Sequence, residues 1–213
     1  MNNIKEMNPV PRKLRDKLLR RSDILEAAIR VFAEKGYHEA TMLDIARQAE
    51  YAVGTIYLYF KDKQSLYLAL IDEKTEGFIR STESKIDKTQ EVLDKIKVLV
   101  EEELLYFEEN RDFFKIYFSE GGIDNWTIKD KPHISTINKL ARFLDYVAGI
   151  MKAGQDKGII KDDLEPKKAA YLLMSLIKAN TLPWFKESQV KEGGLRGQTA
   201  AILDIFLRGV SAR

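Results

Sequence analysis

Residues 40–66, ATMLDIARQAEYAVGTIYLYFKDKQSL, have the pattern of two short helices joined by a tight corner and followed by the start of a third helix. Thr41 is placed to cap the first helix, and Asp44, three residues later, completes a capping-box-like pair. Residues 50–52 form the predicted corner. Residues 53–59 form a second helix of about two turns, which is stable only when it packs on neighbours. Two short helices at a steep angle are typical of a helix-turn-helix that fits a DNA major groove.

The second short helix is expected to divide its side chains into two sets. Ile56 and Phe60 are four residues apart and are therefore expected to point inward. Thr55, Tyr57 and Tyr59 are expected to face outward, where their hydroxyl groups are available for hydrogen bonds. The sequence therefore predicts a helix that presents hydrogen-bonding side chains to a DNA groove.

The same stretch resembles the DNA-binding signature of the TetR family of bacterial transcriptional regulators. That signature commonly has a threonine, three residues, Ile-Ala, a corner, Gly-Thr-Leu-Tyr-x-Tyr-Phe and then Lys-x-Lys. At the matching positions this chain has Thr41, Ile45, Ala46, GTIYLYF at residues 54–60 and KDK at residues 61–63. It departs from the signature in the corner, where Glu50 replaces the usual glycine, Tyr51 the following aliphatic residue and Ala52 the usual serine cap.

The resemblance implies an all-α fold of about nine helices in two domains. Residues 1–62 would form an N-terminal three-helix helix-turn-helix domain that binds DNA. Residues 63–213 would form a C-terminal helical domain for ligand binding and dimerisation, and a helix over residues 62–87 would link the two. The implied protein is a homodimeric repressor that binds a palindromic double-stranded DNA operator and responds to an unknown small, mostly apolar ligand. Dimerisation is expected because one short recognition helix contacts only a few base pairs.

By the same resemblance, the residues expected to contact DNA are Thr41, Tyr51, Ala52, Thr55, Tyr57, Tyr59, Lys61 and Lys63. Thr41, Tyr57 and the two lysines would mainly hold the phosphate backbone, which positions a protein on DNA without specifying sequence. Thr55 and Tyr59 would face bases or nearby phosphates. Tyr51 and Ala52 would either touch base methyl groups or pack internally.

Length and composition agree with a two-domain cytoplasmic protein. At 213 residues, the chain exceeds a small helix-turn-helix module by roughly 150 residues, enough for a second core. Its 45% hydrophobic and 32% charged residues are typical of a globular protein, and no segment predicts a signal peptide or a membrane span. The absence of Cys suits a reducing compartment. With only two His residues, far apart in sequence, no metal site or cofactor is expected.

Positive charge is concentrated at the N-terminus, although the net charge of the whole chain is only +2. Residues 1–22 contain seven Lys or Arg residues against Glu6 and Asp16, a net of +5. Pro9 and Pro11 keep the first residues irregular, and a helix is expected from Arg12 to Gly36. The basic segment either contacts DNA phosphates or a minor groove, or is simply a solvated helix start.

The remainder of the chain is predicted to be entirely helical. The expected helices after the linking helix cover residues 89–110, 111–119, 133–157, 166–187 and 196–209. The breaks between them are indicated by glycines and prolines at residues 121–122, 132, 158, 166 and 193–194. Pro183 predicts a kink or an early end within the helix over residues 166–187.

The sequence does not predict an enzyme. It contains no Gly-rich phosphate loop after a strand, and neither H-E-x-x-H nor G-x-S-x-G occurs. His38, beside the helix-turn-helix, and His133, at a loop-to-helix boundary, are each interpreted as surface or capping residues. No group of residues has the composition and spacing of a catalytic site.

Aromatic residues are concentrated in the second half of the chain. They either form ordinary core packing or line a pocket for an apolar or partly aromatic small molecule. Glu103 and Asn180 each interrupt an apolar helical face, so each requires a partner inside the protein or on a ligand, or partial exposure to solvent. Asn180 could also serve a subunit interface. The predicted ligand-binding residues are Glu103, Phe107, Phe114, Tyr117, Phe118, Trp126, Phe143, Asn180 and Trp184.

The last two predicted helices resemble the dimerisation helices of the family. Their apolar residues would form a four-helix interface between two subunits, namely Leu172, Leu176, Ile177, Ile202, Ile205, Phe206 and Val210. The alternative to an operator-binding regulator is a helical protein that binds a small molecule and acts through protein partners without recognising DNA.

Overall fold

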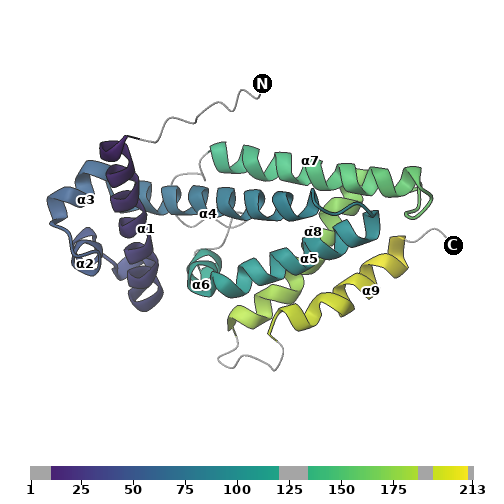
Figure 1. The fold of residues 1–213 in the computed structure, drawn as a ribbon. Helices are drawn as coiled ribbons and strands as arrows, with labels where there is room; N and C mark the ends of the chain where they lie inside the picture. The colour runs from purple at the N-terminus through teal and green to yellow at the C-terminus, as the bar shows by residue number, and fades with distance from the viewer. Residues whose placement is uncertain (1–10, 120–133, 187–193, 211–213) are drawn as a thin grey trace, which may run out of the picture. The chain divides into compact units, whose positions relative to one another are not determined.

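The computed structural model describes residues 11–119, 134–186 and 194–210. Every regular element within these ranges is a helix, which confirms the predicted all-α class (Figure 1). The chain divides into two compact units, Met1–Tyr67 and Leu68–Arg213. The helix α4 (Lys63–Ile86) begins in the first unit and continues into the second. No helix in the described part of the chain has the length and apolar character needed to cross a membrane.

The first unit contains the helix-turn-helix and its supporting helix. The three helices are α1 (Arg12–Glu39), α2 (Met42–Gln48) and α3 (Val53–Tyr59). α1 packs on α2, which packs on α3. Tyr67 in the first turn of α4 completes this core, with its ring centroid 4.9 Å from that of Tyr37. The buried apolar residues that these helices contribute include Ile24, Leu25, Ala28, Val31, Phe32, Ile45 and Ile56.

Local sequence signals set the ends of the helices in this unit. The predicted capping box is present: Thr41 Oγ1 accepts from the Asp44 amide at 3.1 Å, and Asp44 Oδ2 accepts from the Thr41 amide at 3.0 Å. Hydrogen bonds from Lys35 and Thr41 lower the pKa of Asp44 to about 2. Gly36 has φ of 78°, which interrupts the helical geometry at the predicted position, although α1 resumes through Glu39.

The second unit is a bundle of longer helices. It contains most of α4 together with α5 (Val92–Glu109), α6 (Arg111–Ser119), α7 (Ile134–Asp156), α8 (Pro166–Lys186), the 3₁₀ turn Arg196–Gln198 and α9 (Thr199–Val210). α5 contacts α6, α7, α8 and α9 and so lies at the centre of this core. α4 runs beside α7 (Figure 1). Asp72 on α4 accepts hydrogen bonds from Thr136 Oγ1 and Lys139 Nζ on α7, each at 2.9 Å.

The structure corrects part of the prediction for the last helices. Of the kink or early end predicted at Pro183, the early end does not occur, because α8 continues to Lys186. Ile177, Ile202, Phe206 and Val210 were predicted to face a second subunit, whereas all four are buried in the core of this unit. Their apolar stripe is needed by α8 and α9 to pack on the rest of the bundle. Of the apolar residues predicted for the interface, Leu172 and Ile205 are exposed, at 47% and 59%, and remain interface candidates.

Several predicted features lie outside the described residues. They are Trp126, His133, the irregular start at residues 1–10 and the breaks at residues 121–122, 132 and 193.

Candidate functional site

The outward face of α3 exposes Tyr57, as the sequence predicts, and also the apolar residues Val53 and Leu58. Ile56 and Phe60 are buried, whereas the Tyr57 side chain is 53% exposed. Thr55 and Tyr59 are half-buried, and Ala52 at the start of the helix is exposed. α3 therefore offers hydroxyl groups from the first unit to a partner, while Ile56 and the following residue Phe60 hold it in the core.

Tyr51 and Glu50 form the corner between α2 and α3. Glu50 adopts φ of 58°, the left-handed region that favours glycine, at the position where the family signature has glycine. The Tyr51 hydroxyl donates a 2.8 Å hydrogen bond to Asp23 Oδ2 on α1, and this bond raises the pKa of Tyr51. Of the two interpretations of Tyr51, the structure therefore supports internal packing, which fastens the corner to α1.

Lys63 has a structural role that the sequence did not predict. Its ammonium group donates to the backbone carbonyl oxygens of Tyr37 at 2.6 Å, His38 at 2.9 Å and Ala40 at 2.8 Å. It also lies 4.7 Å from the centroid of the Tyr37 ring. An ammonium group has three N–H donors, and here three carbonyl oxygens at the end of α1 accept from it. A DNA phosphate contact by Lys63 would have to compete with these bonds and stays a prediction, as does the contact by Lys61, which is exposed.

The Thr41 hydroxyl is also used within the fold. Besides accepting from the Asp44 amide, it donates to Asp44 Oδ2 at 2.6 Å. Thr41 is exposed, so a DNA contact by this residue stays a prediction, but it would share a hydroxyl that already caps α2.

A basic groove lies between the start of α1 and α3. It is lined by Arg12, Lys13, Asp16, Lys17, Arg20 and Tyr59. Four of these six residues are cationic, and Tyr59 was predicted from the family resemblance to contact DNA. This arrangement favours the phosphate-binding interpretation of the basic segment over that of a merely solvated helix start.

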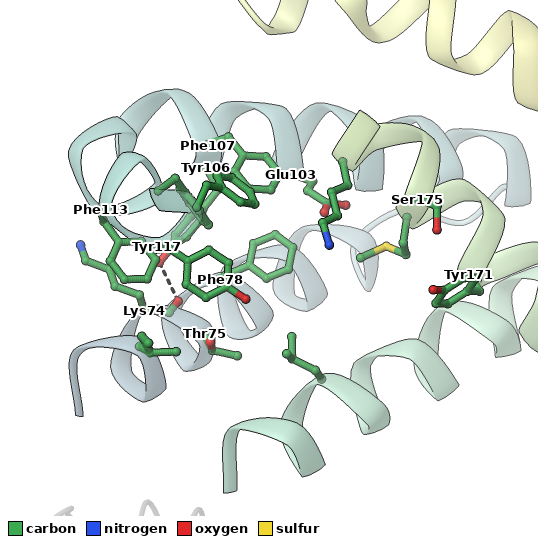
Figure 2. Close-up of a pocket in the computed structure, with 16 residues that line it drawn as sticks. Lys74, Thr75, Phe78, Glu103, Tyr106, Phe107, Phe113, Tyr117, Tyr171 and Ser175 are labelled. Atoms are coloured by element: carbon green, nitrogen blue, oxygen red, sulfur yellow. Dashed lines mark hydrogen bonds between the residues drawn. The ribbon is translucent and has the colours of Figure 1, made fainter. Parts of the chain in front are cut away.

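The second unit contains a cavity of about 330 Å³ between α4, α5, α6, α7 and α8 (Figure 2). This volume lies within the range of small-molecule pockets. Seven aromatic rings on α4, α5 and α6 form much of its wall: Phe78, Tyr106, Phe107, Phe113, Phe114, Tyr117 and Phe118. The cavity is therefore mainly apolar, with a few polar side chains among the rings.

The structure brings together some of the predicted ligand residues and separates others. Glu103, Phe107, Phe114, Tyr117 and Phe118 line the cavity. Three others do not. Phe143 is buried in the core against Phe78, with ring centroids 5.3 Å apart. The Asn180 amide donates to the Leu176 carbonyl oxygen at 2.8 Å within its own helix. Trp184 packs on Phe185, and the Arg111 guanidinium lies 4.8 Å from its ring.

Sequence reasoning missed the contributions of α4 and α8 to the wall. α4 provides Ile71, Lys74, Thr75 and Phe78, and α8 provides Tyr171, Met174, Ser175 and Lys178. Both sets have the spacing i, i+3, i+4, i+7, which places them on one face of each helix. This shared periodicity of mixed polar and apolar residues was the signal that could have identified them.

Tyr106 joins α4 to α5 at one side of the cavity. Its hydroxyl donates to the Lys74 carbonyl oxygen at 2.7 Å. Asn110 accepts from Lys74 Nζ at 2.8 Å and donates to the Tyr106 carbonyl oxygen at 3.0 Å. Burial raises the pKa of Tyr106 to about 12, so its phenol stays neutral and keeps the proton that it donates. These bonds fix the position of α4 against the pocket.

Two family models match consecutive parts of the chain. Residues 24–70 match "Bacterial regulatory proteins, tetR family", and residues 71–191 match "YsiA-like protein, C-terminal region". The second match alone covers more than half of the chain. The chain belongs to the TetR family. The two matches meet inside α4, close to the point where the structure divides into its two units.

Three proteins that are named as fatty acid regulators or as FadR resemble this chain over most of its length. The fatty acid metabolism regulator protein of Bacillus subtilis is 27% identical over 188 residues, which cover 88% of this chain and 93% of that protein. The FadR structure from Bacillus halodurans, a fatty acid degradation regulator, superimposes with a TM-score of 0.75 at 23% identity, covering 88% and 98% of the two chains. FadR from Bacillus subtilis in complex with stearoyl-CoA gives a TM-score of 0.72 at 24% identity over the same shares.

Membership of the TetR family, together with the exposed face of α3, establishes the general function. This chain is a DNA-binding helix-turn-helix transcriptional regulator with a C-terminal ligand-binding domain. The relatives named above are regulators by their names, and none of these names describes an enzyme.

Proposed function

We propose that this chain is a homodimeric repressor whose affinity for a palindromic operator is set by a small, mostly apolar ligand in the α4–α8 cavity. The observation that best supports this proposal is the continuity of α4. Lys63 and Tyr67 in its first turn pack within the DNA-binding unit. Ile71 and Phe78 of the same helix line the cavity in the second unit. A ligand that shifts α4 in the cavity would therefore act on a helix whose first residues belong to the DNA-binding unit.

The proposed ligand class is a long-chain fatty acyl thioester. The aromatic wall suits an apolar chain, and Lys74 and Lys178 provide positive charge at the cavity for an acidic head group. The regulator from Bacillus subtilis that is 27% identical to this chain is named for fatty acid metabolism, and the FadR structure with stearoyl-CoA has the same fold. The relatives therefore indicate an acyl-CoA as the compound to test, and the aromatic wall and two lysines of the cavity are the physical reason to test it.

The proposed DNA contacts come from α3 and the start of α1. Tyr57 and Lys61 are exposed and would hold phosphates, and Thr55 and Tyr59 would reach bases or nearby phosphates. The cationic groove beside Tyr59 would neutralise further phosphates. In a dimer, two such units must meet major grooves about 34 Å apart, which makes the operator palindromic.

Selection from genomic DNA tests the operator part of this proposal. Purified protein is incubated with sheared genomic fragments, and the bound fragments are sequenced and compared with random DNA at equal salt. We expect the bound fragments to share an inverted repeat and to bind at least about 10³-fold more tightly than random DNA. Equal affinity for both pools would contradict operator recognition and favour the alternative of a ligand-binding protein that acts through protein partners.

A further inference from the structure

Glu103 is a buried carboxyl group in the wall of the cavity. It lies on the core face of α5, where Leu99 and Phe107, four residues on either side, are buried. Its side chain is only 6% exposed, and its Oε2 atom has no hydrogen-bond partner among the described residues. Figure 2 shows it beside Tyr106 and Phe107 among the side chains that surround the cavity. A buried polar atom without a partner is unfavourable, so the fold alone does not explain this residue.

The surroundings of Glu103 favour its neutral form. Burial raises the pKa of Glu103 to about 8, because an ionised carboxylate loses its hydration. A neutral carboxylic acid has one O–H donor, which an ionised carboxylate lacks. The ionisable groups that line the same cavity are Lys74 on α4, Tyr106 on α5, Tyr117 on α6, and Tyr171 and Lys178 on α8, and Leu140 is the lining residue of α7.

We propose that Glu103, as the neutral acid, donates a hydrogen bond to a carbonyl oxygen of the bound ligand and thereby selects ligands in which a carbonyl joins an apolar chain to a polar head. The inference rests on the proposed ligand function of this cavity and specifies its chemistry further. A carbonyl accepts a hydrogen bond without adding charge to the cavity, so it satisfies the acid at the smallest desolvation penalty. The thioester carbonyl of an acyl thioester lies between chain and head, as this selection requires.

A cationic ligand is the main alternative partner of Glu103. Aromatic rings and a carboxylate together attract cations. However, Lys74 and Lys178 line the same cavity, so a cationic ligand would meet two like charges. It would also require Glu103 to lose its proton in a buried position. The charges at the cavity therefore favour a neutral acceptor next to Glu103.

The test compares two ligands that differ only at the carbonyl. Palmitoyl-CoA has the thioester, and S-hexadecyl-CoA has the same head and a chain of equal length with CH₂ in place of the carbonyl. Calorimetry gives the Kd of both for wild type, Glu103→Gln and Glu103→Leu. We expect the thioester-to-thioether preference in wild type and Glu103→Gln to exceed that in Glu103→Leu by about threefold to tenfold, the effect of one neutral hydrogen bond. Glu101→Gln is the control. Glu101 lies two residues before Glu103 on the outer side of α5, where it approaches Lys97, and this variant should keep the wild-type preference.

Measuring the thioester-to-thioether preference at several pH values shows whether Glu103 acts as a neutral acid or as an ionised carboxylate. The extra preference of wild type should disappear as pH rises through about 8, because Glu103 loses its donor, while Glu103→Gln keeps its preference. A preference that is identical in wild type and Glu103→Leu would overturn the inference but leave the acyl-CoA proposal standing. If neither CoA compound binds wild type, both fail. Binding of decyltrimethylammonium that strengthens with pH and is lost in Glu103→Gln would assign the carboxylate to a cation and also overturn it.

Discussion

Lys63 and Lys61 are two residues apart, yet the structure gives them different tasks. Lys63 donates to three carbonyl oxygens at the end of α1, whereas Lys61 is exposed. We predict that Lys63→Ala lowers the stability of the DNA-binding unit by about 1.5–3 kcal/mol, the value of hydrogen bonds to a charged group. Lys61→Ala should leave stability unchanged and lower the slope of log affinity against log salt by about 0.9.

Thermal unfolding followed by circular dichroism and operator titrations at several salt concentrations separate these two effects. The assignment of Lys63 fails if its Ala variant unfolds like wild type and shows the reduced salt slope instead. The resemblance alone predicted a phosphate contact for both lysines, because sequence spacing does not show which ammonium group meets the end of α1.

Glu103 should make the second unit less stable at higher pH. Its pKa is about 8 in the folded chain against 4.5 for an ordinary glutamate, so the unfolded state releases the proton first. The folded state then binds more protons than the unfolded state between these values, and stability falls as pH rises from 4.5 to 8. Between pH about 6 and about 8, wild type should lose on the order of 2 kcal/mol relative to Glu103→Gln in urea unfolding. Parallel pH dependence of the two proteins would show that Glu103 is not desolvated.

At the scale of elements, local chemistry determines where helices begin and end. The capping pair Thr41 and Asp44 and the positive φ of Gly36 lie at the predicted positions. Pro183 does not end α8, which is packed on α6, α7 and α9 and continues past a residue that would end an isolated helix. Tertiary contacts, which sequence spacing does not encode, decide such cases.

Apolar spacing predicts that a helix has a buried face but does not identify what buries it. Ile202 and Phe206 are buried in the core of their own unit, although their helical spacing is equally compatible with a subunit interface. Aromatic composition has the same ambiguity at the pocket. Phe107 lines the cavity, whereas Phe143, equally apolar, fills the core beside it.

The exposed apolar residues of α8 and α9 provide the test of the proposed dimer. We predict that Leu172→Glu combined with Ile205→Glu gives a folded monomer, because both side chains are about half exposed in one chain and would be desolvated in a dimer. Leu93→Glu on α5 is the control, since Leu93 is also exposed but lies on another helix. Light scattering after size-exclusion chromatography gives the mass. A double variant that remains dimeric would place the interface elsewhere.

At the scale of the whole molecule, α4 is the element that the two units share. Its first residue, Lys63, is bound to the end of α1, and Tyr106 and Asn110 hold Lys74 of the same helix at the cavity. The sequence predicted a continuous linking helix over residues 62–87. It did not predict the contacts at either end, because each partner lies more than twenty residues away along the chain.

If occupancy of the cavity controls operator binding, a saturating ligand must change the affinity of the protein for its operator. Operator affinity is measured by fluorescence anisotropy with and without saturating palmitoyl-CoA, for wild type and for Ser175→Trp, which fills the cavity from α8. We predict that the ligand changes the operator affinity of wild type by about 5–150-fold and that Ser175→Trp no longer responds. Identical operator affinities with and without ligand, in wild type that calorimetry shows to be saturated, would contradict the claim.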